Sequence, residues 1–557
     1  MTDGAGWAEL SPAERPVFLV GFMAAGKTTV GRRLAELLRR PFVDCDEELQ
    51  RRLGRAPAEI FSAEGEAFFR AAEKAFLAEL AAQDRPLVVA TGGGLCQDPE
   101  NRRLLQTAST FFLDLPPETL WARLTPQGQA QRPLAATRAA FDALWLRRRP
   151  QYRDCGRTVA ADDPPEATAR LIEDLLLAAE PLTLTAEGRQ TVIRTHAPAE
   201  KLPALAADLV GGRRVLTLLD RFFQAADDPF PAAFPGAPLH RPEAQGEAAK
   251  TFAEAQRLLT IMVEARLDRG DFLAARGGGS LTDLGAFCAG LFRRGLNLIL
   301  SPTTLLGAVD AAVGGKAAVN LAGAKNQVGL FHLPREVWID PTLLSRLPPR
   351  LLAEGLTEAY KTGLLFEPAL AALIERRLPD LLRGDAPLLN ETIRRSVQAK
   401  AALVEQDFRE EKGLRDVLNL GHTYGHVVES HHGPAVSHGR AVALGLAAAL
   451  EFSKQRLGFD AATALRGQRL CLALAGGRFP PAPPPAEAQR LLSFDKKIRG
   501  GRLKFAALAE PGRPLIVEAA PEAILDAAAA AVQAVAAPEA VKDGWDARPA
   551  RADELTD

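Results

Sequence analysis

The stretch "VFLVGFMAAGKTTVGRRLAELLRR", residues 17–40, decides the fold of the amino-terminal part of the chain. A short run of β-branched and aromatic residues leads directly into a glycine-containing turn, and the turn leads into a segment with helical periodicity. In this context a GxxxxGKT sequence indicates a phosphate-binding loop, because backbone N–H groups can approach phosphate oxygens at the helix N-terminus. The lysine can reach the terminal phosphates, and the next threonine can bind Mg²⁺. The predicted nucleotide-contact residues are Gly21, Gly26, Lys27, Thr28 and Thr29.

Strand-like and helix-like segments continue to alternate after this loop, which is typical of βαβ units and a parallel sheet. Strand periodicity restarts behind Pro181, and a second α/β region follows. Beyond it, long segments with a 3.6-residue period and no strands between them predict a mostly helical region. We therefore expect an α/β protein with a P-loop kinase domain at 1–180, a Rossmann-like domain at 181–347, a mostly α-helical metal-binding domain at 348–540 and a polar tail at 541–557.

The composition of the chain limits the classes of function that remain. Of the 557 residues, 47% are hydrophobic and 25% are charged, as in globular proteins, and the net charge of -1 indicates neither nucleic acid nor an anionic membrane as a partner. The five cysteines include no CxxC pair, which argues against a disulfide framework and against a cysteine zinc site. Neither a signal peptide nor a membrane-spanning run is visible. We expect a cytoplasmic enzyme that acts on small molecules.

Three features after the loop narrow the phosphate acceptor. In "FVDCDEEL", Asp44 and Asp46 are two residues apart, which would place them on the same side of a strand; "EGEAFFR" ends in Arg70; and "VVATGGG" ends a strand in three glycines. With these features, the first 175 residues or so resemble shikimate kinase. Another small-metabolite kinase, such as gluconate kinase, would share the P-loop but would not be expected to combine the aspartate pair with the glycine triplet.

The resemblance to shikimate kinase implies roles for individual residues. Asp44 would support the Mg²⁺ that accompanies the co-substrate ATP, and Arg132 would belong to the lid over ATP. The implied shikimate pocket consists of Asp46, Arg70, Gly92, Gly93, Gly94 and Arg148. Arginines suit a carboxylate and an aspartate suits hydroxyl groups, so this set fits a hydroxylated ring acid.

A second unusual stretch, "NLGHTYGHVVESHHGPAVSHG" at 419–439, holds five of the eight histidines. His422 and His426 are four residues apart on one predicted helix face, so spacing alone would assign both to zinc, with a carboxylate as the third ligand. His431 and His432 lie beside a Gly-Pro turn and are interpreted as surface residues. Earlier, the glycines at 277–279 follow a predicted strand and would suit a dinucleotide pyrophosphate, although three glycines alone are weak evidence.

Most of residues 183–510, including "GGGSLTDLGAF", "GAVDAAVGGKAAVN", "TEAYK" and "FDKK", resemble 3-dehydroquinate synthase, an enzyme that depends on NAD⁺ and on Zn²⁺ or Co²⁺. The resemblance implies Glu358, His422 and His438 as metal ligands and leaves His426 for the substrate. Such a Glu/His/His set keeps an open position, which is the pattern of catalytic rather than structural zinc. The implied reaction is transient oxidation of a substrate hydroxyl, loss of phosphate, return of the hydride and ring closure.

The same resemblance implies the remaining contacts. The implied substrate and catalytic residues are Arg294 (from a neighbouring subunit), Lys316, Asn326, Lys361, Lys400, Arg415, Asn419, His426 and Lys496. The implied nucleotide contacts are Glu247, Lys250, Gly277, Gly278, Gly279, Asp283, Thr303, Thr304, Asp310 and Lys325. Two departures from the family pattern stand out: Arg440 replaces a glutamate after His438-Gly439, and one extra residue separates Lys400 from Arg415.

The sequence therefore predicts a bifunctional enzyme of aromatic amino-acid biosynthesis, a homodimer through its synthase half. One activity would phosphorylate shikimate with ATP, and the other would convert 3-deoxy-D-arabino-heptulosonate 7-phosphate to 3-dehydroquinate and phosphate. The two steps are not consecutive, so the fusion would fix stoichiometry rather than channel a product. Two alternatives remain: the carboxyl-terminal half is a metal-dependent polyol dehydrogenase, or one half is catalytically silent. The many cations near one metal site count against the first, and the complete set of predicted catalytic residues counts against the second.

Overall fold

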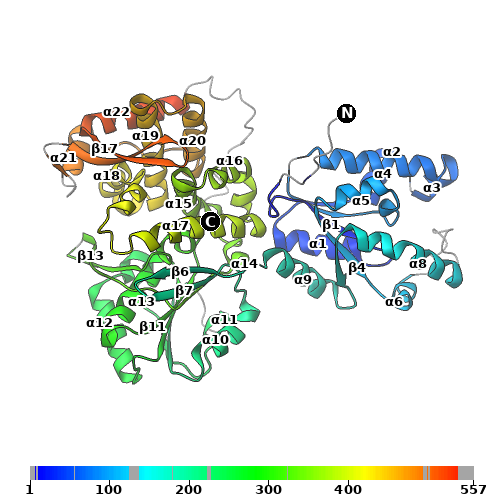
Figure 1. Ribbon diagram of the computed structural model, residues 1–557, viewed down its shortest axis with the longest axis horizontal. Coiled ribbons are helices and arrows are strands. Elements are labelled where there is room, and N and C mark those ends of the chain that lie inside the picture. The colour runs from blue at the N-terminus through cyan, green and yellow to red at the C-terminus, as the bar shows by residue number, and fades with distance from the viewer. Residues whose placement is uncertain are drawn as a thin grey trace. The chain divides into compact units, whose positions relative to one another are not determined.

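The computed structural model of this protein describes Trp7, 10–55, 57–83, 85–124, 137–178, 180–222, 228–322, 324–493, 498–499 and 502–536. The chain divides into two compact units (Figure 1): the first comprises residues 1–178 with 385–388, and the second comprises the rest. Each unit has its own hydrophobic core. Among the described residues, no helix is both long enough and apolar enough to cross a bilayer.

The first unit is built on a parallel sheet of five strands in the order β2-β3-β1-β4-β5. The central strand is β1 (Val17–Val20), and all four of its residues are buried, as its apolar sequence predicts. The other strands are β2 (Phe42–Asp44), β3 (Val88–Ala90), β4 (Ser109–Asp114) and β5 (Arg157–Ala160). Figure 1 shows helices on both sides of this sheet. This arrangement confirms the predicted parallel P-loop fold.

Helix α1 begins at Lys27, directly after the loop that follows β1. The helices of this unit are α1 (Lys27–Leu38), α2 (Cys45–Leu53), α3 (Pro57–Ala63), α4 (Glu66–Ala81), α5 (Pro99–Leu105), α6 (Pro117–Ala122), α8 (Arg138–Cys155) and α9 (Pro165–Leu177), with a 3₁₀ turn η1 (Leu95–Gln97). The expectation that Asp44 and Asp46 share one strand is wrong. Asp44 ends β2 and caps α2 by accepting from the backbone N–H of Asp46, so Asp46 lies in the first helical turn.

The second unit begins with a sheet of seven strands in the order β6-β7-β14-β11-β10-β8-β9, in which only β6 and β7 pair antiparallel. Its strands are β6 (Leu182–Ala186), β7 (Arg189–Arg194), β8 (Val215–Leu219), β9 (Leu239–His240), β10 (Phe272–Gly277), β11 (Asn297–Pro302) and β14 (Glu336–Trp338). Its helices are η3 (Ala199–Lys201), α10 (Leu202–Val210), α11 (Pro229–Ala232), η4 (Gly246–Ala249), α12 (Phe252–Glu264), α13 (Gly279–Leu291), η5 (Phe292–Arg294), the π-helix η6 (Gly307–Ala311) and α14 (Pro341–Leu344). A separate antiparallel hairpin is formed by β12 (Lys316–Leu321) and β13 (Ala324–Phe331).

The remainder of the second unit is mostly helical, as predicted (Figure 1, yellow to red). Its helices are α15 (Pro349–Phe366), α16 (Pro368–Arg383), α17 (Ala386–Gln406), η7 (Leu414–Asn419), α18 (His422–His432), η8 (Gly433–Ala435), α19 (His438–Leu457), α20 (Ala461–Leu474), α21 (Pro485–Ser493) and α22 (Pro521–Ala536). The run "AVALGLAAAL" makes α19 apolar on all sides, and these residues are buried. The sequence did not predict the antiparallel sheet that β15 (Ile498–Arg499), β16 (Arg502–Glu510) and β17 (Arg513–Ala519) form in this region.

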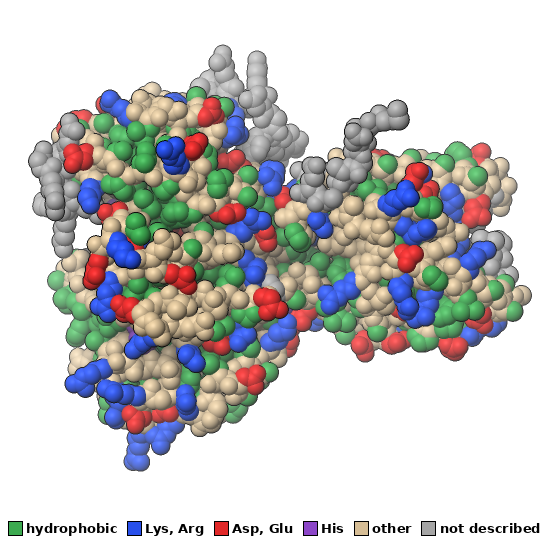
Figure 2. Space-filling model, in the orientation of Figure 1, with side chains coloured by type: hydrophobic (Ala, Val, Ile, Leu, Met, Phe, Trp, Pro, Cys, Tyr) green, Lys and Arg blue, Asp and Glu red, His purple; other side chains and the backbone are tan. Residues whose placement is uncertain are grey.

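On the face shown in Figure 2, basic and acidic side chains are interspersed over both units. This distribution agrees with the near-zero net charge of -1. All five cysteines are free and buried. Their distribution provides no disulfide framework, and the stability of each unit therefore depends on its own apolar core.

Candidate active sites

The loop between β1 and α1 has the geometry of a phosphate-binding loop. Gly21 and Gly26 have φ of 156° and 85°, which glycine adopts readily. The ammonium of Lys27 donates to the carbonyl oxygens of Gly21 and Phe22, each at 3.0 Å, so it lies within the curve of the loop. The Thr28 hydroxyl donates to Asp44 Oδ2 at 2.6 Å, which brings both predicted Mg²⁺ residues together. Thr29 is exposed in the first turn of α1.

The glycine triplet after β3 lies among the charged residues predicted to bind the acceptor. An added Cβ at Gly92 would overlap Glu73 and approach Asp46 Oδ1 to 2.7 Å, and one at Gly94 would overlap the guanidinium of Arg70. These glycines are therefore required by close approach of side chains. The structure brings Asp46 and Arg70 to the two ends of one short loop.

The middle glycine of the triplet, Gly93, is hydrogen-bonded to helix α8. The carbonyl oxygen of Gly93 accepts from Arg148 Nη1 at 3.2 Å and from the hydroxyl of Tyr152. Both donors come from α8, one helical turn apart. Burial lowers the pKa of Arg148. Asp46, Arg70 and Arg148 thus each lie against a different glycine of the triplet, while Arg132 lies outside the described residues.

Sequence reasoning missed Glu73, whose side chain is buried in this pocket. Its Oε2 accepts from Arg70 Nη1 at 2.5 Å, while Oε1 has no hydrogen-bond partner among the described residues. Burial raises the pKa of Glu73 to about 7, although the charge of Arg70 opposes this shift. In the sequence, Glu73 could be connected to the site only by its position three residues after Arg70 on the same helix. That spacing does not identify a site residue, because it occurs in many surface ion pairs.

In the second unit, Glu358, His422 and His438 form the group of described residues with metal-binding geometry. Glu358 Oε1 lies 3.4 Å from His422 Nε2 and 3.3 Å from His438 Nε2. A tetrahedral zinc ion with bonds of about 2.1 Å separates its ligand atoms by about 3.4 Å, so the two distances from Glu358 Oε1 fit such a site, and all three ligand atoms lie within 4.8 Å of one another. The donor chemistry fits as well, because two imidazoles and one carboxylate leave a fourth position open.

The outer nitrogen of each of these histidines also faces an acceptor. His422 Nδ1 is 3.2 Å from the carbonyl oxygen of Leu420, and His438 Nδ1 is 3.3 Å from Glu429 Oε2. With the ring proton assigned to Nδ1, both rings donate outward and direct the Nε2 lone pair toward Glu358. Burial lowers the pKa of His422 to about 3. Burial also opposes the charged form of His438, but Glu358 and Glu429 outweigh it and raise the pKa of His438 to about 10, so binding of a metal there would displace a proton.

His426 lies one turn after His422, with ring centroids 5.3 Å apart, so the helical spacing was a reasonable clue. The structure nevertheless groups His422 with His438, which begins the next long helix, around the oxygen of Glu358. The ion pair between Glu358 and Lys361 lies within α15, and both side chains are buried. Burial raises the pKa of Glu358, but the charge of Lys361 and the contacts with the two histidines outweigh this effect and hold the pKa well below its usual range.

Several predicted substrate cations converge near this cluster. Lys400 donates to the carbonyl oxygen of Asp310 at 2.6 Å and pairs with its carboxylate. Arg415 lies beside Lys400: a Cβ added at Gly314 would be 3.3 Å from Arg415 Nη2 and 3.7 Å from Lys400 Cε. Burial lowers the pKa of both cations. Lys316 and Arg415 both pair with Glu410, which joins Lys316 to the same group.

The predicted nucleotide residues gather at the carboxyl ends of β10 and β11. Gly277 ends β10 and its carbonyl oxygen accepts from the backbone N–H of Thr303 at 2.9 Å, so the turns after the two strands are adjacent. Gly278 lies beside Thr304, and Gly279 begins α13. Such a junction of two strand ends with a helix N-terminus is a typical dinucleotide site.

A polar network closes this side of the site. Lys250 Nζ donates to Asp283 Oδ2 at 2.5 Å and to Asn326 Oδ1 at 2.6 Å. Glu247 accepts from Ser280 at 2.8 Å and from Asn320 at 2.7 Å. Burial raises the pKa of Asp283 to about 6 against the opposing charge of Lys250. The network connects η4, α13 and the β12–β13 hairpin.

The other predicted residues are more peripheral. Asn419 ends η7, where its amide donates to the carbonyl oxygen of Asp416 at 3.0 Å. Lys325 pairs with Glu429 at 2.6 Å, Arg294 is exposed in η5, and Lys496 lies outside the described residues. The unusual Arg440 donates to carbonyl oxygens of Ala475 and Arg478, at 3.1 and 3.3 Å. Its charge is therefore held by backbone oxygens after α20.

Sequence reasoning also missed Asp220 and Glu429. Asp220 follows β8, and its Cβ lies 3.3 Å from a Cβ added at Gly277, so it adjoins the glycine turn. In dinucleotide-binding folds, an acidic residue at the end of a neighbouring strand often accepts hydrogen bonds from the ribose hydroxyls. Glu429 is seven residues after His422 on α18, so the helical period placed both on one face.

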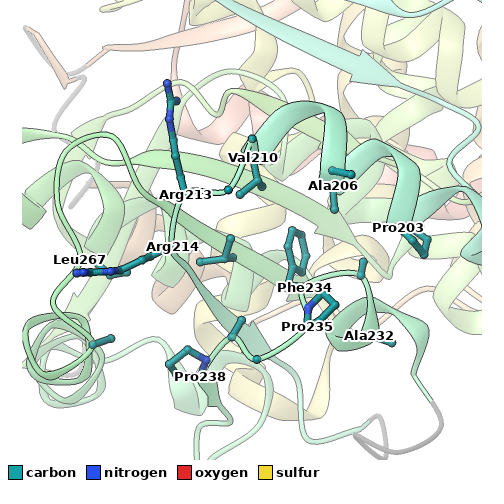
Figure 3. A pocket seen from close by; sticks show the side chains of 18 residues that line it. Pro203, Ala206, Val210, Arg213, Arg214, Ala232, Phe234, Pro235, Pro238 and Leu267 are labelled. Carbon is teal, nitrogen blue, oxygen red and sulfur yellow. The ribbon is translucent and has the colours of Figure 1, made fainter.

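A cavity of about 540 Å³ lies elsewhere in this unit, at the amino end of β8 (Figure 3). It is enclosed by the end of α10, the segment after α11 and Leu267, and Phe234 points into it while Arg213 points away. Its walls are largely apolar and contain none of the predicted site residues. The candidate chemistry therefore lies at the opposite, carboxyl end of the sheet.

Comparisons with known proteins give a consistent result. Residues 23–176 match the family model for shikimate kinase, 242–354 the one for the 3-dehydroquinate synthase N-terminal domain and 355–498 the one for its C-terminal domain. A 3-dehydroquinate synthase of Chlorobium luteolum is 41% identical over 280 residues, which cover 49% of this chain and 77% of that protein.

One solved structure and one further relative complete the comparison. ValA, a 2-epi-5-epi-valiolone synthase from Streptomyces hygroscopicus subsp. jinggangensis with NAD⁺ and Zn²⁺ bound, is 26% identical with a TM-score of 0.56, covering 63% of this chain and 98% of that chain. The bifunctional shikimate kinase/3-dehydroquinate synthase of Thermotoga maritima is 35% identical over 520 residues, which cover 92% of this chain and 99% of that protein. With both halves matched in one continuous relative, this chain belongs to the family of bifunctional shikimate kinase/3-dehydroquinate synthases.

Proposed function

We propose that the first unit phosphorylates shikimate with ATP and that the second converts 3-deoxy-D-arabino-heptulosonate 7-phosphate to 3-dehydroquinate and phosphate. The observation that carries this proposal is the presence of two complete constellations in one chain. One joins the phosphate loop to a pocket of two arginines and an aspartate, and the other joins a Glu/His/His cluster to a group of cations. Neither constellation has an evident structural role.

In the kinase unit, catalysis requires positioning and charge neutralisation more than covalent chemistry. Lys27 and the loop N–H groups would bind the transferred phosphate, and Thr28 with Asp44 would hold Mg²⁺. Arg70 and Arg148 suit the shikimate carboxylate, because guanidinium groups bind carboxylates with two parallel hydrogen bonds. Asp46 would accept hydrogen bonds from the ring hydroxyls and orient the attacking oxygen toward the loop.

In the synthase unit, Glu358, His422 and His438 would hold zinc, and the β10–α13 turn with Asp220 would hold NAD⁺. When bound, the nucleotide supplies a reversible hydride acceptor and the metal supplies a Lewis acid for substrate hydroxyls. Lys316, Lys400 and Arg415 suit the phosphate and carboxylate of the substrate by charge. The NAD⁺ and Zn²⁺ in the ValA structure support this assignment of cofactors.

We also propose that two copies of the chain associate through the synthase half. Arg294 is exposed in η5, directly after α13, so it is available to a second copy. A polyol dehydrogenase with this fold would need the metal and the nucleotide but not a group of cations. The convergence of Lys316, Lys400 and Arg415 therefore favours a substrate with two anionic groups.

The decisive experiment measures phosphate release from 3-deoxy-D-arabino-heptulosonate 7-phosphate by the purified chain with NAD⁺ and Zn²⁺ but without ATP. We expect release that stops after chelation and returns with Zn²⁺, and in a separate assay ATP-dependent phosphorylation of shikimate. Release that chelation leaves unchanged would contradict the metal site. No release from protein with bound metal, together with NADH accumulation from glycerol, would instead identify a dehydrogenase.

A further inference from the structure

We infer that Glu429 is a positioning residue for the metal site: it orients His438 and is itself held by Lys325 of the β12–β13 hairpin. The inference rests on the proposed function, because it concerns the same candidate zinc cluster. It assigns to Lys325 a role toward the metal site, in addition to the nucleotide contact that the sequence resemblance implied. The hairpin from the nucleotide-binding half would thereby contribute to a metal site that is otherwise helical.

The first step of the argument is the position of Glu429 on its helix. His422, His426 and Glu429 recur at intervals of four and three residues, so they share one face of α18. That face is directed toward the start of α19, where His438 is the first helical residue. The Glu429 side chain is only 15% exposed, and its Oε2 lies 3.3 Å from His438 Nδ1.

The second step compares the two histidines. His422 Nδ1 faces a backbone carbonyl oxygen, that of Leu420, whose position is fixed by the chain turn before α18. Among the described residues, His438 Nδ1 faces the Glu429 side chain instead of a backbone carbonyl oxygen. A carboxylate on Nδ1 holds the ring proton there and keeps the Nε2 lone pair directed at the metal position. Glu429 therefore does for His438 what the backbone does for His422.

The third step concerns what holds the carboxylate. A side-chain acceptor is useful only if its rotamer is fixed, and the second oxygen of Glu429 accepts from Lys325 Nζ at 2.6 Å. Lys325 precedes Asn326, which accepts from Lys250 in the nucleotide network. A continuous set of contacts thus runs from His438 through Glu429 to the hairpin. The alternative is that Lys325 and Glu429 form an ordinary surface ion pair that does not affect the metal site, since the Lys325 side chain is 57% exposed.

The same helix offers a matched control. His431 Nδ1 lies 3.1 Å from Glu487 Oε2 of α21, so a carboxylate faces the same nitrogen of a histidine on α18. His431 is not part of the Glu/His/His cluster. Glu487→Ala removes a carboxylate that faces the Nδ1 of a histidine on the same helix, and it leaves the residues of the candidate metal site unchanged.

The experiment measures Zn²⁺ affinity of metal-free full-length protein by competition with a chromophoric chelator. We expect Glu429→Ala to weaken Zn²⁺ binding about 10- to 100-fold, the usual effect of losing a group that orients a metal ligand. Glu429→Asp should recover part of the loss, and Glu487→Ala should bind like wild type. Lys325→Met should weaken binding about two- to fivefold, as expected for a partly exposed ion pair. Shikimate kinase activity of each variant reports whether the chain is folded.

A double variant tests the order of the contacts. Because Lys325 acts through Glu429, Lys325→Met should have no further effect on Zn²⁺ affinity in the Glu429→Ala background. Wild-type Zn²⁺ affinity in Glu429→Ala, or equal losses in Glu429→Ala and Glu487→Ala, would overturn the inference. The His438→Ala variant distinguishes failure of this inference from failure of the proposed function. If His438→Ala binds Zn²⁺ like wild type, the Glu358/His422/His438 cluster itself is not the metal site.

Discussion

Replacing Gly94 by alanine should disable the kinase by displacing a substrate-binding guanidinium. The added Cβ would overlap the Arg70 side chain, which Glu73 and Glu66 hold in place by ion pairs of 2.5 and 3.0 Å. The flexible arginine has to move, because the backbone of the triplet is fixed through the hydrogen bond between Gly93 and Arg148. Arg70 would then no longer face the position of the shikimate carboxylate.

The magnitude follows from the contact that is lost. A hydrogen bond to a charged group contributes about 1.5–3 kcal/mol, which corresponds to an increase of about ten- to a hundredfold in the KM for shikimate. The KM for ATP should change little, because the P-loop is not touched. A coupled assay of ADP formation at varied shikimate measures both constants. Phosphate release by the synthase unit of the same chain is the internal control for folding.

Two further variants make the reasoning refutable. Arg70→Ala should raise the KM for shikimate by a similar factor, and adding Gly94→Ala to it should change the KM less than twofold, because the displaced group is already absent. If Gly94→Ala leaves the KM for shikimate unchanged, or if the two effects multiply, displacement of Arg70 is not the mechanism.

Three other perturbations test separate parts of the structure. Glu73 has a pKa of about 7 in the folded protein, above its usual 4.5, so the folded state binds its proton more tightly than the unfolded state does. The resulting contribution to the free energy of unfolding is fully present below pH 4.5 and is lost as the pH rises through 7. The unfolding free energy of wild type, measured with urea, should therefore fall by about 3 kcal/mol relative to Glu73→Gln over that range, and parallel pH profiles would contradict it. His438→Ala should abolish Zn²⁺ retention and phosphate release but spare shikimate phosphorylation; loss of both activities in a folded variant would contradict independent sites. Arg276→Met leaves Asp228, its buried ion-pair partner at 3.0 Å, without a counter-charge and should destabilise the synthase unit by about 3 kcal/mol in urea unfolding, whereas an unchanged midpoint would show that this pair is dispensable.

Local sequence was sufficient for features that depend on neighbouring residues. The β1–loop–α1 junction needs only an apolar run, two glycines and a helical period, and the parallel sheet follows from repeated alternation. The β15–β17 sheet was not anticipated because its strands lie behind a proline-rich segment in a largely helical region. Asp46 was misplaced because the capping side chain of Asp44 starts α2 at Cys45, before the strand could extend to Asp46.

The partners of site residues depended on tertiary contacts instead. Helical spacing paired His422 with His426, yet the oxygen of Glu358 on α15 meets the nitrogens of His422 and His438. No periodicity within α18 contains that information, because it depends on how α15 and α19 pack against it. Glu73 was missed for a related reason, since only the close approach of Gly92 shows that its carboxylate belongs to the pocket.

Each candidate site is built on elements of one unit, and each unit has its own core. The core of the first unit is formed by residues between Trp7 and Ile172, and that around the seven-stranded sheet by residues between Ala197 and Trp338. Since each site is built on elements of its own unit, removal of a metal ligand changes packing and charge around α15, α18 and α19 but leaves the β1–α1 loop intact. Fusion then has one necessary consequence, which is an equal number of kinase and synthase sites per chain.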